Sequence, residues 1–262
     1  DGTEQRFLPR GVATGVGSLA YVDPDDAVEA VLTQCPELPF WPQLTCRHPS
    51  EYMVAQALAG LPFFESDRLG EWRLRATRKE IDHAFQQLQL AQASHTFAPY
   101  GLKETHAAGW FAMMRALERQ VKRPTTFKGQ LVGPLTLSMC VRGAGDAWLV
   151  HDTQACDLLE LLTTLRALWQ VEAIRAFEMQ PLIVIDEPGL GQYVEAGLAL
   201  DLARDMLQRI VQYLHAEGAW VGLHCCADPP WALLFEIGVD VISFDVFRYA
   251  RTLVHSSKQA AT

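Results

Sequence analysis

The chain has 262 residues, of which 49% are hydrophobic, so it is long enough to bury a large core. Its formal net charge of −9 disfavours a nucleic-acid groove or an anionic membrane surface as a partner. The longest apolar runs are too short to cross a bilayer, and the six scattered cysteines predict a reducing, cytoplasmic compartment without a disulfide framework.

Short apolar runs alternate with longer helical stretches along the chain. Helices are predicted over residues 23–35, 153–179, 198–218 and 229–238, and two more fall in a long excursion at about 50–125, where they could pair as a hairpin. Strands are predicted over residues 11–19, 38–44, 127–133, 182–187, 220–226 and 239–245.

The predicted strands are continuous apolar runs, which is typical of parallel strands covered on both faces, so the pattern indicates an α/β fold. No G-x-G-x-x-G loop with a helix behind it follows the first strand, which disfavours a doubly wound dinucleotide fold. We therefore expect one (β/α)₈ TIM barrel domain over residues 1–262. Active sites of such barrels lie at the carboxyl ends of the strands, where this chain has Ser18, Asp186, His224, Cys226 and Asp245.

The stretch "GLHCC" (222–226) ends one predicted strand. Since side chains alternate along a strand, His224 and Cys226 share a face and Cys225 points the other way. Imidazole and thiolate are both zinc ligands, and Asp245, at the end of the next strand, could add a carboxylate. The alternatives are a core histidine beside a packing cysteine, and for Asp245 a helix N-cap or an ion pair with Arg248.

The stretch "IDEP" (185–188) places two carboxylates at another strand end. Asp186 and Glu187 point to opposite faces, so one of them is expected to enter the site as an amine-binding or proton-handling group. Ser18, in "GVGSL" (15–19), offers a hydroxyl and backbone N–H groups suited to a carboxylate.

Taken together and in this order, "GVGSL", "LVGPLTL", "IVIDEPGL", "LHCC" and "DVISFD" resemble the zinc-dependent catalytic domain of cobalamin-independent methionine synthase. The resemblance runs from about residue 11 to residue 247. It implies a (β/α)₈ barrel, a Zn²⁺ cofactor and methyl transfer to the thiol of homocysteine. The methyl donor would be a methylfolate or a methyl-corrinoid protein.

The resemblance also implies roles for individual residues. His224 and Cys226 match zinc ligands, and Asp245 falls where the family has a zinc-binding glutamate. Ser18 and Asp186 match residues that hold the carboxylate and the amine of homocysteine.

The chain departs from the family most clearly toward its C-terminal end. No cysteine follows Cys226 to act as the last zinc ligand, and only six strands are predicted, so either the C-terminal part lies outside this chain or a ligand has been lost. A sheet left open after six strands is expected to associate into homo-oligomers or exchange segments. Two other functions stay open: a uroporphyrinogen decarboxylase-like enzyme, for which Arg6 and Arg10 would supply basic groups, and a non-catalytic barrel that binds a small molecule or a corrinoid partner.

Overall fold

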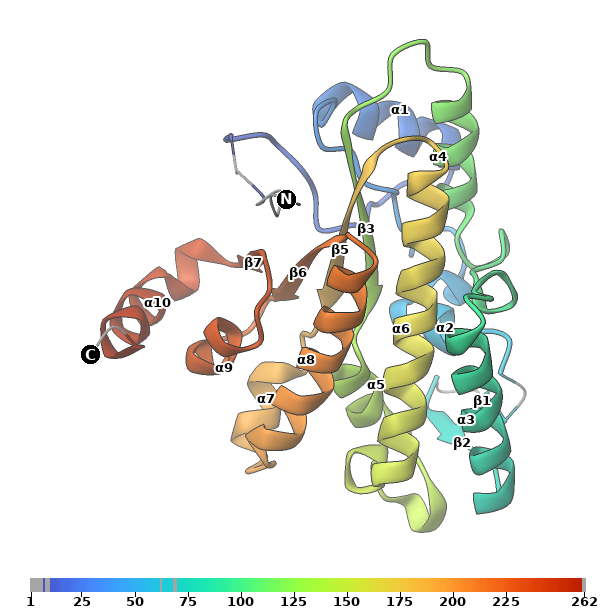
Figure 1. The fold of residues 1–262 in the computed structure, drawn as a ribbon, viewed down its shortest axis with the longest axis vertical. Helices are drawn as coiled ribbons and strands as arrows, with labels where there is room; N and C mark the ends of the chain where they lie inside the picture. Colours follow the sequence, from blue (N-terminus) through green and yellow to red (C-terminus); the bar gives the residue numbers. More distant parts are fainter. Residues whose placement is uncertain (1–6, 8–9, 62, 68–69, 261–262) are drawn as a thin grey trace.

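The computed structural model describes residues 7, 10–61, 63–67 and 70–260, and Arg6 lies outside them. The fold is α/β, as predicted, with a parallel sheet and a layer of helices packed along it (Figure 1). None of the described helices is both long and apolar enough to span a membrane.

The central sheet has four strands in the spatial order β3-β5-β6-β7, and each neighbouring pair is parallel. These strands confirm the last four predicted from the sequence: β3 (Thr126–Val132), β5 (Gln180–Asp186), β6 (Trp220–Cys225) and β7 (Val241–Phe244). The register aligns Asp186 with His224 and His224 with Ser243, so the carboxyl ends of three strands meet at one edge.

The first two predicted strands are wrong as full strands. Residues 11–19 contribute only the parallel bridge of Ser18 with Gln43, and residues 38–44 add one bridge from Phe40 to Lys128. The prolines of the second segment explain this, since Pro39 and Pro42 have no N–H to donate to a ladder. The bridges still place both segments beyond β3, so the order across the sheet follows the order along the chain.

A small second sheet joins two short strands of the excursion to a third at residues 141–142, and none of the three was predicted from the sequence. Its strands, in the order β1-β2-β4, are two or three residues long. They are β1 (Phe64–Ser66), β2 (Trp72–Leu74) and β4 (Val141–Arg142).

Ten α-helices and four short 3₁₀ helices lie within the described residues. The α-helices are α1 (Pro24–Gln34), α2 (Met53–Leu58), α3 (Arg78–Ala93), α4 (Ala108–Glu118), α5 (Pro134–Cys140), α6 (Thr153–Arg175), α7 (Leu190–Glu195), α8 (Leu200–Ala216), α9 (Trp231–Glu236) and α10 (Val246–Ala260). The 3₁₀ helices are Pro49–Glu51, Ala98–Tyr100, Ala144–Asp146 and Leu149–His151.

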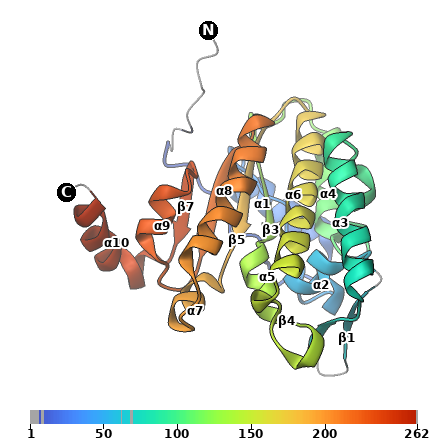
Figure 2. The same ribbon diagram turned by 60° about the horizontal axis from the view of Figure 1, so that its bottom comes forward.

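Helices α3, α6 and α8 stand side by side as one layer (Figure 2). The sequence predicted α3 and α4 as helices, but their main helical neighbours are α6 and α1 rather than each other. Helix α6 starts where the Asp152 carboxylate accepts a hydrogen bond from the N–H of Ala155 (3.2 Å), and most of its residues are buried.

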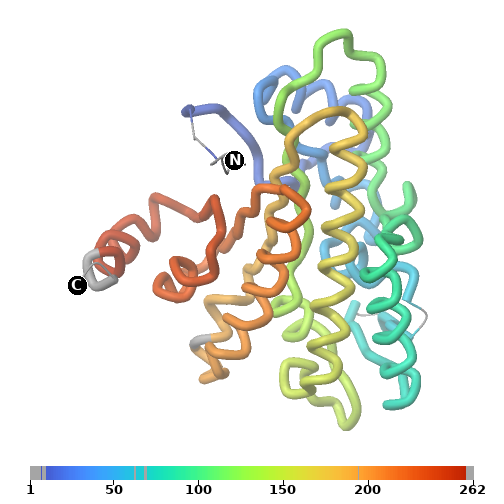
Figure 3. Tube along the Cα trace, viewed as in Figure 1, coloured from blue at the N-terminus to red at the C-terminus, as the bar shows by residue number. Residues whose placement is uncertain are grey.

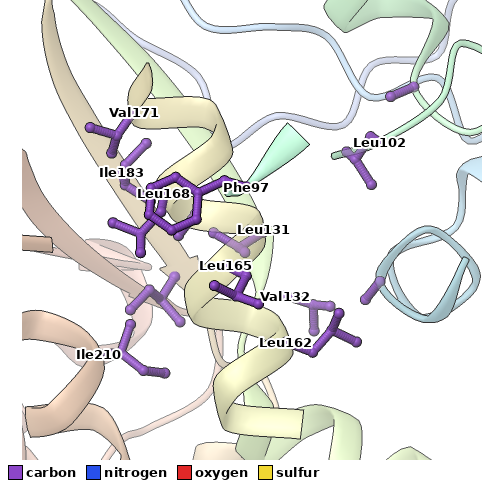
Figure 4. Close-up of a cluster of buried hydrophobic side chains, with 14 of the residues drawn as sticks. Phe97, Leu102, Leu131, Val132, Leu162, Leu165, Leu168, Val171, Ile183 and Ile210 are labelled. Carbon is purple, nitrogen blue, oxygen red and sulfur yellow. The ribbon is translucent and has the colours of Figure 1, made fainter. Parts of the chain in front are cut away.

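The main core lies between α6 and the sheet, as the close-up of Leu131, Leu165, Leu168 and Ile183 shows (Figure 4). We call the face of the sheet that packs against α6 and α8 the outer face, and the opposite one the inner face. Because side chains alternate, the inner face carries Lys128, Gln130, Leu182, Val184, Asp186, Gly222, His224, Val241 and Ser243.

The last described element is α10, which lies on the far side of β7 from α6 (Figure 1 and Figure 3). Helix α10 packs on α9, and α9 packs on α8, so the helical layer continues past β7.

Candidate functional site

A cavity of about 270 Å³ borders the inner face of the sheet. Its floor is apolar, with Leu182 and Val184 from β5 and Val241 from β7. The sheet adds three polar side chains to the lining, Lys128 from β3, His224 from β6 and Ser243 from β7. Residues 11, 12 and 14–16 also line the cavity, and Thr14 is the polar residue among them. An apolar hollow with a few polar groups is the usual form of a small-molecule site.

His224 lines this cavity from β6. Its Nδ1 is 2.9 Å from the Ser243 hydroxyl on the neighbouring strand, which fixes the orientation of the ring. Burial and the nearby Lys128 ammonium lower the pKa of His224, while its hydrogen bond with Ser243 opposes that shift. Both effects favour the neutral imidazole, the form in which histidine binds a metal or accepts a proton.

Asp186 is the register partner of His224 on β5 and is 7% exposed. Its Oδ1 has no hydrogen-bond partner among the described residues. Burial raises the pKa of Asp186 to about 7, and the Lys128 ammonium opposes the rise. A buried carboxylate oxygen left without a partner is costly, so it marks a place where a cationic ligand group would be stabilised.

Lys128 is the positive counterpart of Asp186, and it was missed by the sequence analysis. It is 4% exposed, and burial lowers its pKa to about 8 while Asp186 opposes the shift. Its Nζ donates to the carbonyl of Val16 (2.8 Å) and to Oε1 of Gln130 (3.2 Å). The sequence did contain a signal for it, a lysine in the middle of the predicted strand "TFKGQLV", on the side that strand alternation assigns to the inner face.

Glu187 turns away from the cavity. Its fully buried carboxylate accepts hydrogen bonds from the N–H of Leu135 (3.0 Å), the N–H of Thr136 (2.7 Å) and the Thr136 hydroxyl (2.6 Å). Burial raises its pKa to about 7, and these hydrogen bonds oppose the rise. A side chain at Gly133 would collide with it, since an added Cβ would lie 2.1 Å from Oε1. Glu187 therefore holds the start of α5 to the end of β5.

Ser18 lies at the same edge of the sheet, two residues beyond the carbonyl that Lys128 binds. Its exposed hydroxyl donates to Oε1 of Gln43 (3.2 Å). Gln43 is buried and donates in turn to Oε1 of Gln56 (3.2 Å) and to the Glu51 carbonyl (3.1 Å). Ser18 is thus part of a network of amides at the rim.

The three expected metal ligands are placed differently from one another. Cys226 is exposed just beyond β6, while Cys225 is buried among the outer helices, as strand alternation predicts. The Asp245 carboxylate accepts from the N–H groups of Phe247 (3.0 Å) and Arg248 (3.2 Å) and lies 3.5 Å from the Arg248 guanidinium. It caps α10, one of the alternatives left open above.

Across the described residues, no three His, Cys, Asp or Glu side chains come together as a group that could hold a metal ion. Of the expected ligands, His224 and Cys226 fit zinc by donor type, and the Ser243 contact at Nδ1 is the kind of bond that orients a metal-binding histidine. Asp245 does not fit while it caps α10.

No family model matches this chain, and no curated protein matches it either.

Proposed function

We propose that this protein is a zinc-dependent, methionine synthase-like S-methyltransferase that acts on homocysteine or a similar amino-acid thiol. The observation that supports it best is the buried Asp186 carboxylate, whose unpartnered oxygen lies in register with His224. An ammonium group bound to Asp186 would bring the rest of a small amino acid next to the His224 imidazole and the Cys226 thiol.

We further propose that the sheet belongs to a (β/α)₈ barrel. Six parallel segments follow one another across the sheet in chain order, each pair joined by a helical connection or excursion, which is the arrangement that a barrel requires. The carboxyl edge with Ser18, Asp186 and His224 would then be the catalytic mouth. All six cysteines are free, which is consistent with a reducing cytoplasmic location.

In this proposal His224 and Cys226 hold the zinc ion, and Asp245 joins them only by leaving the N-terminus of α10. A zinc ion held there would lower the pKa of the substrate thiol, so that the thiolate would exist near neutral pH. The chain's own residues bind and orient the acceptor: Asp186 holds its ammonium, and the Ser18 segment holds its carboxylate. Transfer forms a bond between sulfur and the methyl carbon, while the electron pair of the broken bond stays on the methylfolate or methyl-corrinoid donor.

The engagement of Asp245 at α10 favours a second candidate, a barrel that binds an amino acid without catalysis. Metal analysis separates the two. We expect the wild-type chain and Cys225→Ala to bind zinc equally, and His224→Ala and Cys226→Ala to lose it. Zinc-free wild type would favour the binding protein.

Calorimetric titration of homocysteine tests the substrate site directly. A charge-assisted contact contributes about 1.5–3 kcal/mol, so Asp186→Asn should weaken binding about tenfold or more. Its zinc content should stay at the wild-type level, because Asp186 is not a proposed ligand. Glu187→Gln is the matched control, since this neighbouring carboxylate faces α5 and should not affect the titration. Equal binding by wild type and Asp186→Asn would remove the substrate site from the proposal.

A further inference from the structure

Arg166, in α6, is a buried cation without a protein counter-ion. It is 5% exposed, and its guanidinium donates hydrogen bonds to the carbonyl of Gln56 (3.1 Å) and to the carbonyl of Ala59, at the C-terminal end of α2. No Asp or Glu of the described residues forms an ion pair with it, and burial lowers its pKa to about 10 with no carboxylate to oppose the shift. Buried charges are normally paired, because an unpaired one loses its hydration without compensation.

The two carbonyl groups do not balance the charge of Arg166. A guanidinium has five N–H donors, hydrogen bonds to two acceptors are present, and the buried Nε has no partner within the described residues. Carbonyl groups at a helix C-terminus carry only partial negative charge. By contrast, Arg209 on α8 is held by both carboxylate oxygens of Glu160, at 2.8 and 2.5 Å. Arg166 therefore lacks both a full negative charge and an acceptor.

Arg166 also lines a cavity of about 10 Å³ between α2, α6 and the end of β3. The apolar part of its lining includes Leu102, Leu131 and Val132, which are labelled in Figure 4. A space of this size holds about one water-sized particle, so it is too small for a phosphate or a carboxylate group. The cavity shares no lining residue with the larger one on the inner face of the sheet.

The polar side chains that line this small cavity can all donate hydrogen bonds. Thr163, Arg166 and Gln170 recur at i, i+3 and i+7 along α6, so they share one face of the helix. Gln56 and Gln170 each donate one amide hydrogen to a backbone carbonyl (2.6 and 3.1 Å), which leaves each a second N–H. Their amide oxygens accept hydrogen bonds from other side chains. None of the described residues in the lining is acidic.

The surroundings of the cavity are positive, although the whole chain carries a net charge of −9. The carbonyl of His106 accepts a hydrogen bond from Gln56 in the cavity lining. Burial lowers the pKa of the His106 imidazole, and the charges of Arg166, Lys103 and His48 lower it further, with no acidic group opposing them. A positive potential and a set of donors favour an anion over a neutral water molecule.

We propose that this cavity binds a monatomic anion of the halide class, such as chloride, which acts as the counter-ion of Arg166. The charge of Arg166 selects an anion, and the volume of the cavity limits it to a single atom. A bound ion would stabilise the junction of α6 with α2. The inference is independent of the proposed function, because no residue of the proposed zinc or substrate site lines this cavity.

Thermal unfolding in sodium chloride and in sodium gluconate of equal ionic strength tests the inference, since gluconate is too large for the cavity. An ion that binds only the folded protein should raise the Tm of wild type by about 3–6 °C when chloride is at ten times its Kd. Arg166→Met should lose the difference between the two salts. Arg175→Met makes the same substitution at a half-exposed position of α6 and should keep it. Equal Tm values for wild type in the two salts, or an undiminished chloride effect in Arg166→Met, would overturn the inference.

Bromide locates the ion without any substitution, so it decides the question even if Arg166→Met does not fold. A wild-type crystal soaked in sodium bromide should show an anomalous scattering peak in the cavity, beside Arg166 and Thr163. A map without a peak there would show that the cavity is empty or holds water, and would overturn the inference.

Discussion

The two faces of the central sheet treat polar groups in opposite ways, although alternate residues of the same strands form both. On the outer face, Ile183, Ile185, Val221 and Leu223 are completely buried against helices, without a charged group among them. On the inner face, Lys128 and Asp186 are almost as buried but do not form an ion pair with each other, and Lys128 borders a cavity. The outer face therefore carries the stability of the sheet, which leaves the inner face free to hold groups suited to binding.

Truncating one residue on each face should give the largest difference in the free energy of unfolding. Ile183→Ala removes side-chain contacts between β5 and α6 and should lower the free energy of unfolding by about 2–5 kcal/mol. Leu182→Ala, one residue earlier, widens a cavity that already exists and should cost about 2 kcal/mol or less. Urea unfolding of both variants measures the contrast, and equal losses would show that the inner face is packed as tightly as the outer.

Glu187→Gln should have the next largest effect on stability. The amide keeps one acceptor oxygen where the carboxylate has two, so part of the hydrogen bonding from Leu135 and Thr136 is lost. The expected cost is about 1–3 kcal/mol in the free energy of unfolding. Asp186→Asn should change stability less, since the Asp186 side chain has no hydrogen bond of this kind to lose.

Glu187→Gln should also change how the stability of the protein depends on pH. Burial raises the pKa of Glu187 from 4.5 to about 7, so between these values the folded protein keeps a proton that the unfolded chain releases. Its contribution to stability is therefore greatest below pH 4.5, falls as the pH rises to about 7, and is constant above. Subtracting the Glu187→Gln profile from that of wild type should isolate this fall, and a flat difference would contradict the assignment.

The adjacent cysteines give the smallest and most local comparison. Cys225→Ala should lower the free energy of unfolding by about 1 kcal/mol, because its thiol is buried against the outer helices. Cys226→Ala, at an exposed position, should change it by less than about 0.5 kcal/mol. Thermal unfolding of the two metal-free variants measures the difference, and the reverse order would contradict the alternation of faces at the end of β6.

Sequence patterns predicted the parts of the fold that depend on local chemistry. The apolar runs of β3, β5, β6 and β7 and the cap that starts α1 at Asp23 are both visible in the sequence. The first two segments were predicted as strands because they are apolar, but strand pairing also needs N–H donors, which Pro39 and Pro42 lack.

For the site, the sequence could predict only which side chains share a face of the sheet, because that follows from the alternation of side chains along a strand. Parity brought Asp186 and His224 to one face and sent Cys225 to the other. It could not reveal that the Glu187 carboxylate would accept hydrogen bonds from the start of α5, because that depends on how closely two strand ends approach each other. Nor could it reveal that Lys128 lines the same cavity as His224, because Lys128 lies four residues before Val132, the residue of β3 that pairs with Asp186.

The attachment of the Val16–Ser18 segment has a consequence for local opening of the protein. A strand inside the sheet exchanges its amide hydrogens only when much of the sheet unfolds, but this segment is held by the bridge between Ser18 and Gln43 and by Lys128. The amides of Leu19 and Gln43 should therefore exchange with solvent deuterium much faster than those of β5. This edge of the site is then the first part of the sheet to open. A bound amino acid should slow the exchange of the Leu19 and Gln43 amides.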